Sequence, residues 1–312
     1  MTMLSRVTDR LYWTARYLER AEDTARLTQS YTHLIMDIPE GYELGWQLLV
    51  QILDAETQFR EHYRAFNEQN VLRFMIAEPD NGSSLFYCIN QARENVRTTR
   101  DVLPEEAWEL VNELYLYALE YAERSVGRRN RHRFLDQIIA RCQMINGMMM
   151  STLYRDHAYR FTKLGHLLER ADMTTRIIDV GAAALLADRR HHDSFDSLIW
   201  ACILRSLSAM GSYRRIIGPI IEVNDVIDFV FREPGLPRST KFCLDGIRKE
   251  LVTLKHNEEA MRVLERCRRS LSRFDVRHSD RDRLHAFIDR LQLNLNTLND
   301  TITNTWFLPQ HT

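Results

Sequence analysis

The sequence predicts an all-α fold, and three observations support this prediction. Apolar residues recur every three or four positions over long stretches, as they do along one face of an α-helix. Glycine and proline are sparse, at 11 and 7 of 312 residues, and most of them stand between helical segments. Strand-like alternation bounded by Asn-Gly or Asp-Gly turns is nearly absent. We therefore expect a single compact body of about ten to twelve helices.

The first helix is expected within residues 3–38, which neither proline nor glycine interrupts. One stripe along it is apolar or small: Leu4, Val7, Leu11, Thr14, Leu18, Ala21 and Ala25. A second stripe with the same spacing is almost wholly polar: Tyr12, Arg16, Glu19, Asp23 and Arg26. Trp13 and Tyr17 lie between the stripes, so we expect the helix to be covered on several sides. Its charged side chains must then be paired.

Proline, glycine and capping residues delimit the helices that follow. We expect the first helix to end at Pro39–Gly41 and later helices at about Leu44–Ala65, at Val71–Ile76, from a cap at Ser83 or Ser84 to Asp101, from Pro104 to about Gly127, and from Phe134 onward. Glu105 and Glu106 fall in the first turn of the helix that Pro104 opens, where the helix dipole favours acidic residues. The basic run Arg128–Arg133 is interpreted as a connector.

One stretch of the first helix occurs twice in the chain. Leu18–Arg26 reads LERAEDTAR, and LERADMTTR stands 150 residues further on at Leu168–Arg176. Three charged positions are identical in the two copies: Glu19 and Glu169, Arg20 and Arg170, Arg26 and Arg176. Two positions differ: Arg16 is replaced by His166, and Asp23 by Met173. Buried ion-pair networks are more common than active sites, so the structural interpretation of these Glu and Arg residues is favoured, with a functional one left open.

Matching residues continue beyond this stretch at nearly constant offsets. They are Trp46 and Trp200, and Phe59-Arg60 and Tyr213-Arg214, at offset 154; Glu78-Pro79 and Glu233-Pro234, Cys88 and Cys243, and Arg93 and Arg248, at offset 155; and Phe134 and Phe287 at offset 153. We interpret the chain as one domain, residues 1–312, that contains tandem repeats of about 1–153 and 154–312. The helical pattern runs through the join near 151–160. The repeats are expected to pack face to face about a pseudo-twofold axis, with the two LERA helices at the shared centre.

Composition and motifs exclude several classes of function. A net charge of −1 gives no overall field for nucleic acid or acidic membranes. The five cysteines are scattered without a CxxC pair, and no apolar run approaches 18 residues. No Glu has a His three residues later, and Gly-rich phosphate loops, dinucleotide fingerprints and nucleophile motifs are missing. We therefore expect no metal, no cofactor, no nucleic acid and no membrane span, in a cytoplasmic protein; His191-His192-Asp193 is interpreted as a surface loop.

Three arginines, Arg93, Arg97 and Arg100, share one face of a predicted helix because they stand at positions i, i+4 and i+7. One interpretation is that carboxylates such as Glu19, Asp23 or Glu94 neutralise them. The alternative is a binding site for a carboxylate or phosphate group, which the forked guanidinium suits. Under the second interpretation, we expect a positive pocket between this helix and the first one.

Several stretches together resemble the bacterial alpha-E family over nearly the whole chain. They are Leu4–Arg26, Ala92–Asn95 followed by Trp108 and Asn112, and Leu164-Gly165 leading into Leu168–Asp172. The resemblance implies an all-helical fold and an association with circularly permuted ATP-grasp proteins and transglutaminase-like proteins, in peptide or amide-bond formation or modification. The motif positions that it carries over are Arg16, Glu19, Arg20, Arg26, Arg93, Glu94, Asn95, Arg97, Glu169, Arg170 and Arg176.

Two functional hypotheses follow. In the first, the protein is a helical partner of an ATP-grasp-type amide ligase system and binds an anionic group through its Arg/Glu-rich centre. In the second, it is an enzyme acting on amide or acyl-phosphate groups, with Glu19 or Glu169 as general base. The first is favoured because no nucleophile or metal set is visible and a fold alone supplies no chemistry.

Overall fold

The computed structural model describes residues 5–37, 45–186, 194–279 and 281–308, and within them it contains fourteen α-helices and no β-strand. The helices are α1 (Ser5–Asp37), α2 (Gln47–Ile52), α3 (Glu56–His62), α4 (Glu68–Ile76), α5 (Leu85–Arg97), α6 (Glu105–Tyr121), α7 (Arg128–Thr152), α8 (His157–Leu186), α9 (Ser194–Ser206), α10 (Met210–Ile216), α11 (Val223–Arg232), α12 (Thr240–Leu251), α13 (Glu258–Arg273) and α14 (Arg281–Ile302). Short helical turns follow at Arg100–Val102 (η1), Glu123–Ser125 (η2) and Thr303–Phe307 (η3). The all-α prediction is confirmed, with more helices than the ten to twelve expected.

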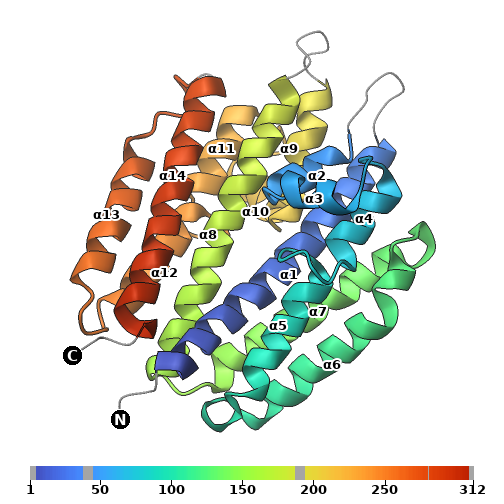
Figure 1. Ribbon diagram of the computed structural model, residues 1–312. Helices are drawn as coiled ribbons and strands as arrows, with labels where there is room; N and C mark the ends of the chain where they lie inside the picture. Colours follow the sequence, from blue (N-terminus) through green and yellow to red (C-terminus); the bar gives the residue numbers. More distant parts are fainter. Residues whose placement is uncertain (1–4, 38–44, 187–193, 280, 309–312) are drawn as a thin grey trace.

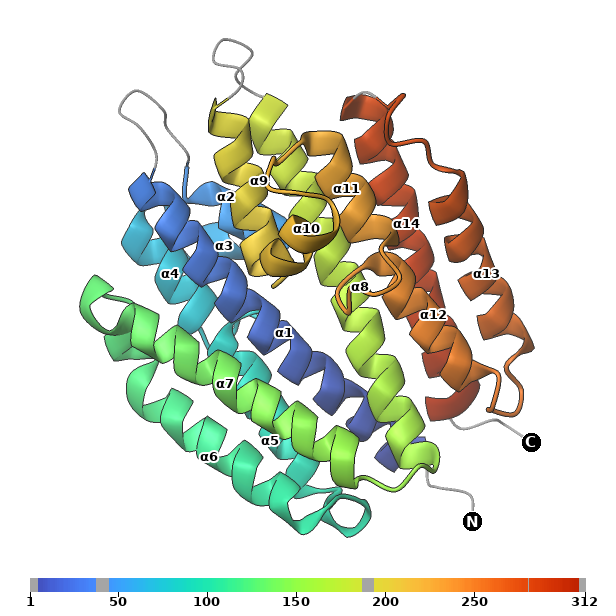
Figure 2. The ribbon, with the colours of Figure 1, turned by 180° about the vertical axis from the view of Figure 1, so that it is seen from behind.

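The two longest helices, α1 and α8, cross in the middle of the molecule (Figure 1). Helix α1 packs against α8, α5, α7 and α9, whereas α8 packs against α1, α12 and α14. Helices α5–α7 therefore lie on the α1 side and α12–α14 on the α8 side, as the view from behind also shows (Figure 2). At 33 residues, α1 is about 50 Å long and spans the whole body.

Glycine 165 allows α1 and α8 to approach closely where they cross. A Cβ atom at Gly165 would lie 2.2 Å from the carbonyl oxygen of Tyr12, which is backbone and cannot swing aside. Only a residue without a side chain fits such a contact. The Glu-Arg pairs begin within one turn of this point, so the close approach brings the two charged stripes together.

Aromatic rings cover α1 around its charged stripe, as expected from the sequence. Tyr12 packs on Phe307 with ring centroids 5.2 Å apart, and Trp13, Tyr17 and Tyr87 form a continuous series. The apolar stripe of α1 is buried in the main core, from Leu11 to Ala25. Consequently, the polar stripe is enclosed as well, and its ionised groups must be neutralised inside the protein.

The structure corrects the expected helix at 44–65, which is two helices. Asp54 interrupts it with a left-handed backbone (φ 54°), and the Ala55 amide donates to the Val50 carbonyl oxygen. Aspartate tolerates this conformation better than branched or bulky residues do. The same break occurs between α9 and α10, where Ser208 also has φ 54°.

Other boundaries agree with the predictions only in part. The Ser84 hydroxyl accepts from the Tyr87 amide at the start of α5, and Pro104 precedes α6, as expected. However, α5 ends at Arg97 and does not continue to Asp101 as expected. The short turn η1 follows it instead. The expected helical continuity through the join at 151–160 is wrong, because Leu153 is extended and separates α7 from α8.

The basic run Arg128–Arg133, expected as a connector, forms the start of α7. Arg128 and Arg131 both donate to the carboxylate of Glu68 on α4, and Arg131 also donates to the Val126 carbonyl oxygen. These bonds neutralise part of the run, so the helix can begin here. The predictions for Pro39–Gly41 and for His191–Asp193 lie outside the described residues.

None of the described helices combines the length and the apolar character that a membrane crossing requires.

We predict that Gly165→Ala destabilises the protein by at least about 1–3 kcal/mol, because the new methyl group would collide with the Tyr12 backbone. Gly147→Ala, inside α7 with nothing within 4 Å of the added Cβ, is the matched control and should be neutral or stabilising by about 0.5–1 kcal/mol. Urea unfolding followed by circular dichroism measures both. Equal stability of the two variants would contradict the close crossing.

Candidate functional site

The centre of the molecule is a reciprocal pair of Glu-Arg contacts between α1 and α8. Arg170 binds both oxygens of Glu19, through Nε at 2.6 Å and Nη2 at 3.1 Å. Arg20 binds both oxygens of Glu169 in the same way, at 2.5 Å and 3.1 Å. Two-point forks of this type are the strongest hydrogen-bonded ion pairs in proteins. The expectation that Glu and Arg residues of the repeated stretch are buried and bonded to each other is confirmed.

In each copy of the motif, the residue three positions before the Glu contacts the Glu of the other copy. Arg16 Nε donates to Glu169 at 2.6 Å, and His166 Nδ1 lies 3.0 Å from Glu19. Burial lowers the pKa of His166 to about 3, so its ring is uncharged at neutral pH where it lies against the carboxylate of Glu19. The two copies of the motif therefore play equivalent structural parts with different side chains.

Two loops close over the forks in matching ways. Arg20 Nη1 donates to the carbonyl oxygen of Gly82 at 3.2 Å, and Arg170 Nη1 donates to that of Pro237 at 3.4 Å. These loops lead into α5 and α12, so each central arginine connects the α1–α8 crossing to a peripheral helix.

Arg238, in the loop before α12, breaks the equivalence. Its Nη1 donates to Glu19 at 3.0 Å and also binds Asp23, while its Nη2 donates to Glu22 at 2.9 Å. At the aligned positions, the chain has Ser83 instead of Arg238 and Met173 instead of Asp23.

The sequence reasoning missed Arg238 because it lies in a loop. A signal was nevertheless present. An acid is gained in one copy (Asp23 against Met173) and a base in the other (Arg238 against Ser83), and side chains that differ together in this way suggest a contact between the copies.

The central carboxyl groups are held in opposite protonation states. Burial disfavours the charge of Glu169, but Arg20 and Arg16 outweigh burial and lower its pKa to about 2. The pKa of Glu19 is likewise held far below its ordinary value by Arg170, His166 and Arg238 against the effect of burial. For Asp23, burial and the charges of Glu19 and Glu22 outweigh the attraction of Arg238 and raise the pKa to about 8. Glu19 and Glu169 are thus fixed anions, whereas Asp23 is mainly protonated at neutral pH.

A cleft of about 320 Å³ leads from the surface to this network. It lies between α1, α7 and α8 and the two loops at Leu207-Ser208 and Leu236–Arg238. Its polar lining consists of Glu22, Arg26, Gln143, Asn146, His166, Ser208, Arg170 and Arg238. The Arg26 guanidinium and the Gln143 amide both donate to Glu22, at 2.9 Å and 3.3 Å. The cleft therefore presents guanidinium and amide donors around one carboxylate.

The cleft lies where residues of the second copy have shorter side chains than the residues aligned with them in the first copy. Tyr12 and Arg16 both donate to Asn299 Oδ1, at 2.8 Å and 2.5 Å, and fill the corresponding region near α14. At the aligned positions on the cleft side stand Thr162, His166 and Asn146. The Oγ1 of Thr162 has no hydrogen-bond partner in the structure. Loss of a phenol and a guanidinium is a sufficient physical reason for the open space.

The arginines of α5 lie elsewhere. Arg93 donates to Asn112 on α6 at 2.8 Å and to Glu94 at 2.7 Å, and Arg97 donates to Glu94 at 2.9 Å. The Arg100 guanidinium stacks 3.6 Å from the ring centroid of Trp108. These side chains face α6 and the surface, as does the helix turn at Asn95, whose carbonyl oxygen accepts from Thr98 and Thr99.

Glu94 thus bonds both Arg93 and Arg97 and offsets one of their two charges, in line with the first interpretation of this cluster. Arg100, which was expected on the same helix face, lies instead beyond the end of α5, in η1. The structure brings Arg16, Glu19, Arg20, Glu169 and Arg170 together at the centre. It sets Arg26 and Arg176 on the flanks, bonded to Glu22 and Asp172, four residues earlier in each copy.

Among the residues that the structure describes, one group of side chains has spacing that could hold a metal ion. Asp179 on α8 lies beside His285 and Asp289 on α14. His285 Nδ1 is 2.7 Å from Asp179, and its Nε2 is 3.6 Å from Asp289. The two ring nitrogens thus face different carboxylates, which is the arrangement of an ion-pair network.

We predict that Glu19→Ala destabilises the protein by roughly 3–5 kcal/mol, because Arg170 would remain in the interior without its carboxylate and Arg238 would lose one of its three partners. Glu94→Ala removes a carboxylate that also binds two arginines but is 39% exposed, and it should cost at most about 1 kcal/mol. Chemical denaturation of both variants tests the comparison. A Glu19→Ala protein as stable as the wild type would show that the network carries no stability.

We also predict a pH dependence that originates from Asp23. Its pKa is raised from 3.8 to about 8, so the folded protein keeps a proton that the unfolded chain releases. The free energy of unfolding should therefore fall as pH rises, by up to about 1.4 kcal/mol per pH unit. The lowered pKa values of His166 and Glu169 act oppositely, and their effect fades above pH 6.5, where the unfolded His has lost half of its protons. Between pH 6.5 and 8, the contribution of Asp23 is therefore the difference in slope between the wild type and a variant whose residue 23 cannot ionise.

Asp23→Asn should flatten the stability profile in that window, because the amide cannot lose a proton. Urea midpoints at pH 6.5, 7.2 and 8 measure the effect in the wild type and in the variant. A slope that persists in Asp23→Asn would assign the titration to another group.

Comparison with known proteins agrees with this architecture. The model of the Alpha-E family, described as a predicted alpha-helical domain with a conserved ER motif, matches residues 3–307. No curated protein and no solved structure matches the chain. Glu19-Arg20 and Glu169-Arg170 are the two Glu-Arg pairs at the crossing of α1 and α8. Because the match covers nearly the whole length, the chain belongs to the Alpha-E family.

Proposed function

We propose that this protein is a helical accessory partner of an ATP-grasp-type amide ligase system in the cytoplasm. In this role it holds an anionic group, a carboxylate or phosphoryl group of the peptide substrate or reaction intermediate, in the cleft beside Arg26, Arg170 and Arg238. The family resemblance supports a circularly permuted ATP-grasp protein as the main partner and a transglutaminase-like protein as a second one. The observation that carries the ligand class is the cleft, which opens directly onto buried guanidinium groups.

The charge balance around the cleft favours an anion. Arg26, Arg170 and Arg238 contribute three positive charges, against the carboxylates of Glu19 and Glu22. Asp23, mainly protonated at neutral pH, adds little negative charge. The amide groups of Gln143 and Asn146 add neutral donors to the lining. Each hydrogen bond from a desolvated Arg to a bound anion would contribute about 1.5–3 kcal/mol.

The alternative enzyme, with Glu19 or Glu169 as general base, fits the geometry less well. Both oxygens of each carboxylate already accept hydrogen bonds from an arginine fork. Their pKa values are lowered, whereas an effective general base has a pKa near the working pH. The two side chains are at most 1% exposed, so a substrate proton has no access to them.

We further propose that the single domain of 1–312 arose by tandem duplication, with repeats of about 1–153 and 154–312 related by a pseudo-twofold axis. The reciprocal forks of the central Glu-Arg pairs support this proposal. The matching backbone at Asp54 and Ser208 supports it as well. In this view, both copies keep the central Glu-Arg contacts, and the cleft arose because side chains diverged in one copy.

Co-purification with the associated circularly permuted ATP-grasp protein tests the proposed partnership. We expect a stable complex, and ATP turnover by the ligase that increases when this chain is present. ATP hydrolysis by the isolated chain, or a ligase indifferent to it, would count against the accessory role.

Calorimetric titration tests the ligand, with acidic peptides, inorganic phosphate and ATP as probes. Arg26→Gln should weaken binding of the accepted probe about tenfold or more, because it removes a charged donor from the cleft lining. The matched control is Arg176→Gln, which removes the equivalent ion pair with Asp172 outside the cleft lining. Equal weakening by Arg26→Gln and Arg176→Gln would locate the binding elsewhere.

A further inference from the structure

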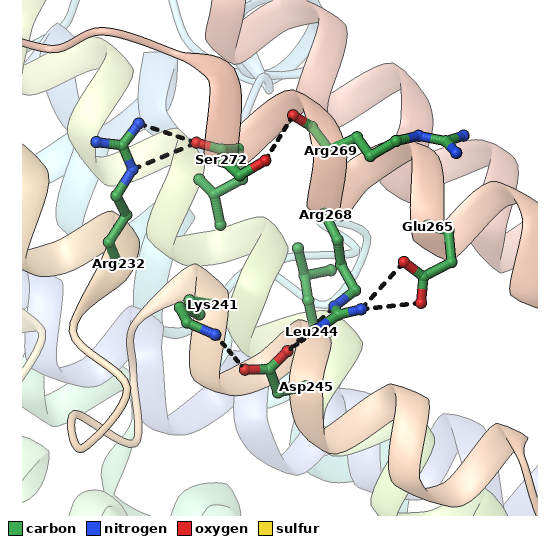
Figure 3. A pocket seen from close by; sticks show the side chains of 9 residues that line it. Arg232, Lys241, Leu244, Asp245, Glu265, Arg268, Arg269 and Ser272 are labelled. Atoms are coloured by element: carbon green, nitrogen blue, oxygen red, sulfur yellow. Dashed lines mark hydrogen bonds and ion pairs between the residues drawn. The ribbon is translucent and has the colours of Figure 1, made fainter.

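A second and larger hollow lies on the α8 side of the molecule, between α11, α12 and α13. Figure 3 shows it bounded by Arg232 at one side, by Lys241 and Asp245 below, and by Arg268 and Glu265 opposite. Its volume is about 500 Å³, which is in the range of small-molecule sites. The apolar part of the lining is Leu244 and Leu271. The hollow shares no lining residue with the central cleft.

The lining of this hollow has an excess of positive charge. Three cationic side chains, Arg232, Lys241 and Arg268, face two acidic ones, Asp245 and Glu265, whereas the exposed Arg269 side chain points away from them (Figure 3). The outer ion pairs leave this excess unchanged, because Asp228, which binds Arg232, and Arg248, which binds Glu265, carry opposite charges. One positive charge remains in a concave site, where a bound anion would compensate it.

The cations are held in position by contacts that leave donors available. Arg268 binds Asp245 at 2.8 Å and Glu265 at 2.9 Å, and Lys241 binds Asp245 at 2.5 Å through one of its three N–H groups. Arg232 donates to the Leu271 carbonyl oxygen at 3.0 Å and also to that of Phe274. These bonds satisfy the last carbonyl groups of α13 and hold the Arg232 guanidinium at the rim, so the site is preorganised.

The aligned region of the first half is filled instead of open. Arg248 on α12 binds Glu265 on α13, just as Arg93 on α5 binds Asn112 on α6. These equivalent contacts align α12 with α5 at an offset of 155 residues. They align α13 with α6 at an offset of 153 residues. In that alignment, Lys241 stands where the first half has Phe86, and Arg268 where it has Tyr115. The rings of Phe86 and Tyr115 pack with centroids 6.2 Å apart. Two packed aromatic rings on one side thus correspond to two cations around a hollow on the other.

From this combination we propose that the hollow between α11, α12 and α13 binds a small molecule that carries a phosphate group. A phosphate group is an anion that compensates the excess positive charge and accepts several hydrogen bonds from Arg and Lys. The remainder of the ligand contacts Leu244 and Leu271. The proposal is independent of the ligase partnership and of the central cleft.

Isothermal titration of the full chain with inorganic phosphate, pyrophosphate and adenosine monophosphate at low ionic strength tests it. We expect binding of at least one probe, weakened at least tenfold by Lys241→Gln, which leaves Asp245 paired with Arg268. Arg266→Gln, an exposed arginine of α13 outside the lining, should leave the affinity unchanged. The component of binding that Lys241→Gln weakens should be unchanged in Arg26→Gln, a variant of the central cleft, which separates this site from the proposed function.

A second variant refills the hollow with the residues of the first half. Lys241→Phe combined with Arg268→Tyr should abolish binding while the far-UV spectrum remains that of the wild type. Tighter binding of adenosine monophosphate than of inorganic phosphate would show that the apolar lining takes part, and the reverse order would show recognition of the phosphate group alone. Absence of binding by every probe at millimolar concentration, or equal weakening by Lys241→Gln and Arg266→Gln, would overturn the proposal.

Discussion

The buried exchange of Glu and Arg between α1 and α8 is the constraint on which the rest of the structure depends. Removing a carboxylate from water costs several kcal/mol, and only near-complete pairing offsets that cost. Glu169 meets Arg20 and Arg16, while Glu19 meets Arg170 and Arg238, so each anion is surrounded by cations from other elements. A shift of α8 along α1 by one turn would break both forks at once. The network therefore fixes the register of the two central helices more sharply than apolar packing alone could.

The same network connects the centre with the periphery. Arg20 and Arg170 each continue to a loop carbonyl, at Gly82 and Pro237, and those loops begin α5 and α12. Apolar packing then adds the outer helices on each side. The Glu-Arg contacts are equivalent on the two sides of the molecule, whereas the side chains around them differ. Space can therefore open on one side while the central contacts stay intact. Both proposed sites follow this pattern, since each lies where the aligned region is filled by larger or aromatic groups.

Much of the centre was predictable because periodicity determines which residues share a helix face. Spacing of three and four predicted the charged stripe of α1, and its second copy predicted that α8 would meet it. The contact that spacing could not supply was Arg238, since a loop residue has no helical face and its neighbour is decided by tertiary packing. The break at Asp54 was missed for a related reason: the residues around it are compatible with helix, and the left-handed turn arises from how α2 and α3 pack.

The arginines of α5 show the opposite limit. Their spacing correctly placed Arg93 and Arg97 on one face, but spacing does not say which neighbour that face meets. For Arg93 the neighbour is α6, through Asn112, whereas Arg97 is half exposed and is bonded to Glu94 of its own helix. The single charge of Glu94 reduces the repulsion within the cluster.

The cleft and the network beneath it are physically linked through Arg238. This one guanidinium lines the cleft and binds Glu19, Glu22 and Asp23. An anion arriving in the cleft would compete with those carboxylates for it, and the group that yields most easily is Asp23, whose pKa of about 8 already favours the proton. The added negative charge would raise that pKa further, so binding of an anion and retention of the Asp23 proton favour each other. Under the proposed function, the proton on Asp23 would thus allow the ion-pair centre to accept one more negative charge.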